Sequence, residues 1–60
     1  MTMADKIEYY LQRAQQERET AANAQCEEAR RAHLALAAEH DKAAEHERAR
    51  LAKLRTPSAA

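Results

Sequence analysis

Sixty residues with ten acidic and ten basic side chains, and hence no net charge, form at most one small domain. Alanine supplies sixteen of the hydrophobic residues, and phenylalanine and tryptophan are absent, so the chain cannot build a large core. No apolar run approaches the ~20 residues that span a bilayer. The lack of net charge argues against nucleic-acid binding as the main task.

The composition predicts an all-α protein. Glycine is absent, Pro57 is the only proline, and four β-branched residues leave little from which to build a sheet. The single cysteine, Cys26, cannot form an internal disulfide. Because the N-terminal residues lack the apolar segment of a signal peptide, we expect a cytoplasmic protein.

The first predicted helix covers residues 3–22. Thr2 and Asp5 have the spacing of a capping box, with Asp in place of the usual Glu. Apolar residues then recur at helical spacing and form one amphipathic stripe. Its members are Met3, Ile7, Tyr10, Leu11, Ala14, Ala21 and Ala22.

The second predicted helix covers residues 27–55. Glu27 and Glu28 suit a first helical turn, and Thr56-Pro57 ends the helix because a residue before proline is disfavoured in helical geometry. Residues 56–60 are expected to be a disordered tail. The stripe of this helix contains Ala29, His33, Leu36, Ala37, His40, Ala43, Ala44, Leu51 and Leu54.

The segment between the stripes decides the fold. It has no glycine or proline, so one long helix in a coiled coil is an alternative, but Thr20, Asn23 and Cys26 are weak helix formers. Residues 1–29 carry a net charge of −3 and residues 30–60 a net charge of +3, which favours antiparallel contact within or between chains. We expect a two-helix antiparallel hairpin that dimerises into a four-helix bundle.

The stretches YYLQRAQQERETAANAQ and RRAHLALAAEHDKAA resemble very short alphaproteobacterial proteins of uncharacterised function, over residues 9–44. The resemblance implies a helical hairpin and names no activity. Two departures are His40, where those proteins tend to have Tyr, and a break without proline. The matching positions are Tyr10, Arg13, Ala14, Glu17, Arg30, His33, Leu36 and Ala37.

The repeated stretch AEHDKAAEHERA, residues 38–49, has the composition of a metal site but not its geometry. His40 and His46 are six residues apart, about 120° around a helix, so they do not share a face. His33 and His40 share a face but lie about 10 Å apart along the axis, too far to bind one ion. We expect both to be polar residues of a helix–helix contact that leucine can replace without loss of stability.

These patterns predict a non-enzymatic protein–protein interaction module, a small self-associating adaptor or accessory subunit that forms a homodimer, with docking on a larger protein as the other way to cover its apolar stripes. No catalytic residues, metal, cofactor or small-molecule substrate are expected. The alternative is a weak nucleic-acid or membrane-surface binder that uses the basic segment RARLAKLR, residues 48–55. The expected interface residues are Ile7, Tyr10, Leu11, Ala14, His33, Leu36, Ala37, His40, Ala44, Leu51 and Leu54.

Overall fold

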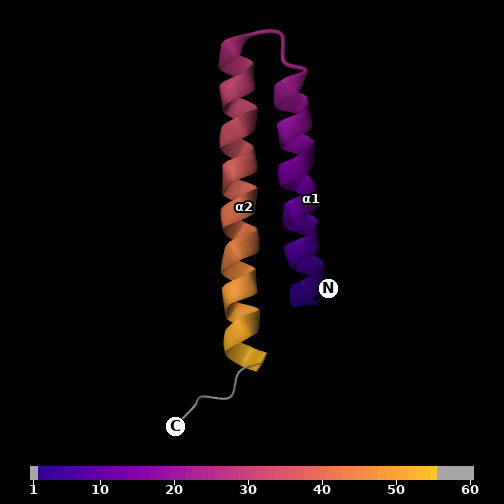
Figure 1. Ribbon diagram of the computed structural model, residues 1–60, viewed down its shortest axis with the longest axis vertical. Helices are drawn as coiled ribbons and strands as arrows, with labels where there is room; N and C mark the ends of the chain where they lie inside the picture. The colour runs from indigo at the N-terminus through magenta and orange to yellow at the C-terminus, as the bar shows by residue number, and fades with distance from the viewer. Residues whose placement is uncertain (1, 56–60) are drawn as a thin grey trace.

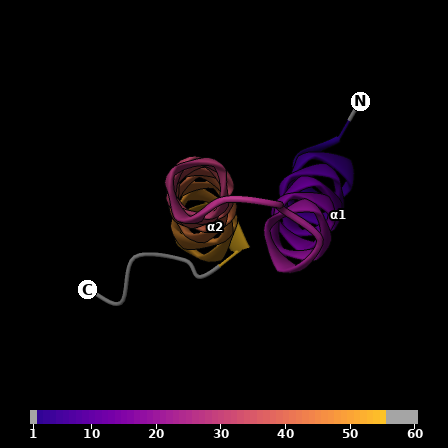
Figure 2. The same ribbon diagram turned by 90° about the horizontal axis from the view of Figure 1, so that it is seen from above.

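The computed structural model describes residues 2–55, which form two helices, α1 (Met3–Ala22) and α2 (Glu27–Arg55). The helices lie side by side and run in opposite directions, joined by a short turn (Figure 1). The view along their length shows two neighbouring axes (Figure 2). The predicted all-helical class and the packing of two helices against each other are confirmed, and one continuous helix does not form. The predicted Thr56-Pro57 stop and the tail at residues 56–60 lie outside the described residues.

The predicted capping box fixes the start of α1. The backbone N–H of Asp5 donates to Thr2 Oγ1 at 3.1 Å, and the backbone N–H of Thr2 donates to Asp5 Oδ2 at 3.3 Å. Two of the unpaired amides at the helix start are therefore satisfied by neighbouring side chains. The carboxylate of Asp5 also lies at the positive end of the helix dipole.

The turn between the helices is built without glycine. Asn23 follows α1 with φ −98° and ψ 3°, and its side-chain Nδ2 donates to the carbonyl oxygen of Glu19 at 3.0 Å. Cys26 precedes α2, and its Sγ accepts a hydrogen bond from the N–H of Ala29 at 3.4 Å. No described residue has a positive φ. Polar and sulfur side chains thus cap both helix ends at the turn, so no left-handed residue is needed.

The residues between the two helices repeat with alternating spacings of three and four, the heptad pattern of a coiled coil. We call these residues the seam. In α1 and α2 they are Met3, Ile7, Tyr10, Ala14, Glu17, Ala21, His33, Ala37, His40, Ala44, Glu47 and Leu51, all buried or half-buried.

Alanine forms the core of the seam. Among the described residues the buried apolar side chains are Ala14, Ala21, Ala37 and Ala44, each at most 3% exposed, and no large side chain is fully buried. Small side chains let two helices approach closely, but each contributes little apolar area, so the hydrophobic stabilisation is modest.

The hairpin is one layer of helix, with extents of 53 × 21 × 12 Å, so nothing in the described chain covers either side of the seam. α2 has 29 residues and α1 has 20, and α2 runs past the start of α1 (Figure 1). Leu54, in the part of α2 that overhangs α1, is 72% exposed. The fold therefore leaves two faces and one helix end available for contact.

A distance measurement between spin labels at Glu8 and Arg50 tests the hairpin directly. One continuous helix would separate these residues by about 63 Å, at 1.5 Å per residue. The hairpin is expected to give less than half of that distance by double electron–electron resonance. A single population near 60 Å would contradict it.

Candidate functional site: the seam and its two faces

A hydrogen-bonded Glu–His pair lies in the seam near the turn between the helices. His33 Nδ1 lies 2.7 Å from Glu17 Oε1, and because a carboxylate only accepts hydrogen bonds, the ring nitrogen is the donor. The Glu17 side chain is 14% exposed, and the nearest Arg13 nitrogen lies 3.8 Å from its second oxygen. The pair joins the two helices at one defined register, as polar seam residues do in coiled coils.

A second carboxylate, Glu47, lies in the seam with one oxygen unpaired. Glu47 is 8% exposed, and Oε2 has no hydrogen-bond partner among the described residues. Its other oxygen is 3.7 Å from Arg50 Nη1. Burying an oxygen that has no hydrogen-bond donor costs desolvation free energy, and no hydrogen bond compensates for that cost.

Aromatic rings pack across the seam between these two carboxylates. The Tyr10 ring stacks on the His40 ring with centroids 6.5 Å apart, and Tyr9 meets Tyr10 edge-on at 5.5 Å. The seam thus contains apolar, aromatic and acidic contacts in place of a continuous row of leucines.

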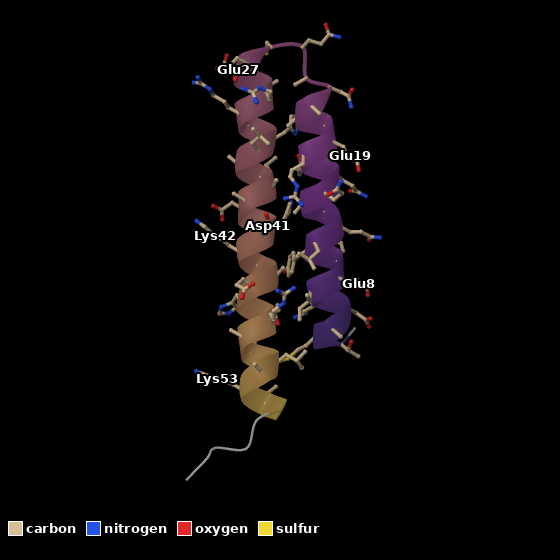
Figure 3. All side chains as sticks on the ribbon, in the orientation of Figure 1. Glu8, Glu19, Glu27, Asp41, Lys42 and Lys53 are labelled. Carbon is tan, nitrogen blue, oxygen red and sulfur yellow. The ribbon has the colours of Figure 1, made fainter. Side chains whose placement is uncertain are left out.

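One side of the seam carries a salt bridge between the helices. Arg18 Nη1 donates to Asp41 Oδ2 at 3.0 Å, and both side chains are nearly half exposed. Leu11 and Leu34 lie seven residues before Arg18 and Asp41 and so share their side of the helices. Figure 3 shows Asp41 at the edge of α2 that borders α1. We call this side, with Leu11, Arg18, Leu34 and Asp41, the bridge face.

The other side of the seam is basic. Lys6 and Arg13 of α1, and Leu36 and Arg50 of α2, immediately precede seam residues and therefore lie across the seam from the bridge face. We call this side the basic face. None of the four is acidic, although Arg13 and Arg50 each lie within 4 Å of a seam carboxylate.

The predicted interface residues divide between the seam and its surroundings. Eight lie in the seam: Ile7, Tyr10, Ala14, His33, Ala37, His40, Ala44 and Leu51. Leu11 follows the seam residue Tyr10 by one position, about 100°, and Leu36 precedes the seam residue Ala37 by one position. The two leucines therefore lie on opposite faces. Leu54 lies on the part of α2 that overhangs α1.

Glu17 and Glu47 were not among the interface residues predicted from the sequence, although Glu17 is one of the positions that match the resemblance. Both occupy positions that the three–four spacing reserves for seam residues: Glu17 follows Ala14 by three, and Glu47 follows Ala44 by three. Because both residues are charged, a search for apolar residues does not select them, whereas the three–four spacing alone predicts seam residues at these positions.

The described residues contain no group of three or more His, Cys, Asp or Glu side chains placed to hold a metal ion. Cys26 is a free, exposed thiol. Within residues 2–55 neither helix is long and apolar enough to cross a membrane. What the arrangement offers is surface for helix packing.

No protein-family model, no curated protein and no solved structure matches this chain. The resemblance to short alphaproteobacterial hairpin proteins therefore stays a prediction, and function is argued from the seam and its faces.

Replacing the two seam histidines by leucine should have different effects. His33→Leu leaves the half-buried Glu17 carboxylate without its closest partner and should lower the free energy of unfolding by about 1–3 kcal/mol. This reverses the expectation for His33 from the sequence. His40→Leu keeps an apolar contact with Tyr10 and should change stability by less than about 1 kcal/mol. Urea unfolding followed by circular dichroism compares the two; equal stabilities would show that the Glu17 contact contributes nothing.

Glu47→Leu should stabilise the hairpin. The substitution removes an unpaired buried oxygen and places leucine at a heptad position, so we expect a gain of about 1–3 kcal/mol. Glu39→Leu, at an exposed position of the same helix, is the matched control and should lie within about 0.5 kcal/mol of the parent. Urea midpoints at one protein concentration measure both. A Glu47→Leu midpoint at or below that of the control would be inconsistent with a destabilising Glu47.

Proposed function

We propose that this chain is a non-enzymatic helical interaction module that self-associates, two hairpins forming a four-helix bundle, and acts as a small adaptor or accessory subunit. The observation that carries the proposal is a single helical layer whose core is alanine and whose two faces are open. A stable small fold needs more buried apolar area than such a layer provides, and a second layer supplies it.

The large apolar side chains on the outside of the hairpin support this proposal. Within the described part of the chain the exposed ones are Tyr9, Leu11, Leu34, Leu36 and Leu54, each between 39% and 72% exposed. A single exposed leucine is common on protein surfaces. Here, exposed leucines lie on both faces of one thin layer and make up a substantial share of the large apolar side chains of the hairpin. Packing against another helical layer would remove them from water.

Charge also favours contact between copies. Figure 3 shows Glu8 and Glu19 projecting from the outer edge of α1, and Lys42 and Lys53 projecting from the outer edge of α2. Where α1 of one copy lies beside α2 of another, Glu8 and Glu19 can meet Lys42 and Lys53, although Lys42 Nζ already lies 3.8 Å from the exposed Glu39 of its own helix. The charge asymmetry of the sequence thus has a counterpart on the surface of the hairpin.

Binding of nucleic acid or membrane through the basic end of α2 has less support. Arg48 Nη1 lies 3.5 Å from Glu45, and Arg50 Nη1 lies 3.7 Å from Glu47. Phosphate binding relies on cations that are free to displace counterions, and here two of the basic side chains already have acidic neighbours.

Self-association predicts a dimer of about twice the 6.8 kDa chain mass at tens of micromolar. Because partner binding adds to folding by mass action, the melting temperature should rise with protein concentration. Light scattering coupled to size exclusion measures the mass, and circular dichroism melts over a hundredfold dilution measure the linkage. A compact monomer whose melting temperature ignores dilution would overturn the proposal.

A further inference from the structure

The two faces of the hairpin differ in what a second copy would meet there. Around the bridge face, Arg18 is paired with Asp41 at 3.0 Å and Arg48 with Glu45 at 3.5 Å, so the local charge is balanced. The basic face presents Lys6 with Arg13 and Arg50, and the nearest acids to the two arginines are the seam residues Glu17 and Glu47.

The apolar content of the two faces also favours the bridge face as the surface for contact with a second copy. The bridge face has two exposed leucines, Leu11 on α1 and Leu34 on α2, at 40% and 39% exposure. The basic face has Leu36, at 45% exposure. Because the two bridge-face leucines come from different helices, a partner packed on them touches both helices.

Two-fold symmetry then selects between the faces. In an interface between identical copies, each surface meets itself, so residue i contacts j and j contacts i. On the bridge side, Asp41 can lie opposite a cation, Arg18 or Arg48, of the other copy. The basic face presents Lys6, Arg13 and Arg50, and the acids nearest the two arginines lie in the seam, so this face places like charges together. Arg18 has further donors, and within the described residues Asp41 uses only one oxygen in the bridge.

We infer that the bridge face is the surface through which two copies of this chain meet, with Leu11 and Leu34 buried and Arg18 of one copy facing the partner's Asp41. The inference rests on the proposed self-association and names its surface. The apolar contacts supply affinity, and the exchanged Arg–Asp pairs fix the orientation of the copies because buried ion pairs contribute more to specificity than to net stability.

Leucine substitutions on the two faces test the surface. Leu11→Gln and Leu34→Gln should each weaken the dimer about tenfold or more, since every substitution removes two apolar contacts per dimer. Leu36→Gln is the matched control, with similar exposure on the opposite face, and should leave the dissociation constant within about twofold. Sedimentation equilibrium measures the constants, and helical content by circular dichroism checks that each variant folds.

Charge substitutions test the ionic contact. Arg18→Asp and Asp41→Arg, each alone, should weaken the dimer about tenfold or more. An equimolar mixture of the two variants should restore dimerisation, because every 18–41 pair between the copies is then of opposite sign. Lys6→Glu, on the basic face, should leave the dimer unchanged.

The outcomes separate this inference from the proposed function. A parent chain that stays monomeric at hundreds of micromolar overturns both. A dimer that is weakened by Leu36→Gln and tightened by Lys6→Glu keeps the proposed function and overturns the bridge face. A dimer that ignores the Arg18 and Asp41 variants, and gains nothing from mixing them, also overturns the inference.

Discussion

The small volume of alanine determines how closely the two helices approach, and the weakness of the fold follows from it. Ala14, Ala21, Ala37 and Ala44 fill the buried positions of the seam, so the helix backbones can lie near one another. Each alanine removes little apolar area from water on folding, while ordering its backbone costs as much as for any other residue. The hairpin therefore depends on capping interactions, on specific polar contacts and on whatever covers its faces.

The acidic residues of the seam show how register is specified where apolar packing is weak. Alanine against alanine is nearly the same at any offset of one heptad, so the core alone distinguishes registers poorly. The 2.7 Å contact between Glu17 and His33 satisfies the half-buried carboxylate in this register. A shift by one heptad would place either Cys26 or His40 opposite Glu17, so the contact disfavours the first of these registers and not the second. Burial of the Glu47 carboxylate also costs desolvation free energy, but no hydrogen bond offsets this cost, since its Oε2 has no partner in the described hairpin. We have no structural account of why this position holds Glu.

Much of the fold could be predicted from short-range signals. Thr2 and Asp5 located the start of α1, the weak helix formers Thr20 and Asn23 indicated its end, and Glu27 with Glu28 marked the start of α2. These signals act over a few residues, and Thr2, Asp5 and Asn23 make the caps of α1 in the structure. The hairpin could not be separated from a long helix in this way, because the turn contains no glycine or proline.

The angular positions of the two apolar stripes around the helix axis distinguish the hairpin from one long helix. Ala21 and Ala37 both face the seam, and sixteen residues of unbroken helix would place them about 160° apart. A straight helix would thus turn its two stripes toward nearly opposite sides, and one partner helix could not cover both. Breaking the chain between them lets both stripes face the same contact. The candidate interface was less predictable, since Leu11 and Leu36 fit the apolar stripes and the structure places them on opposite faces.

A weak core also changes what binding to this chain means. In a hairpin with a large core, folding is complete before a partner arrives, and the measured affinity reports the contact alone. Here, covering a face adds directly to the stability of the hairpin, because a partner that binds only the folded chain shifts the folding equilibrium. The cost of ordering any frayed part of the chain is subtracted from the affinity. Substitutions in the seam should then alter association although they touch no partner, and substitutions on the bridge face should alter the melting temperature although they touch no core residue.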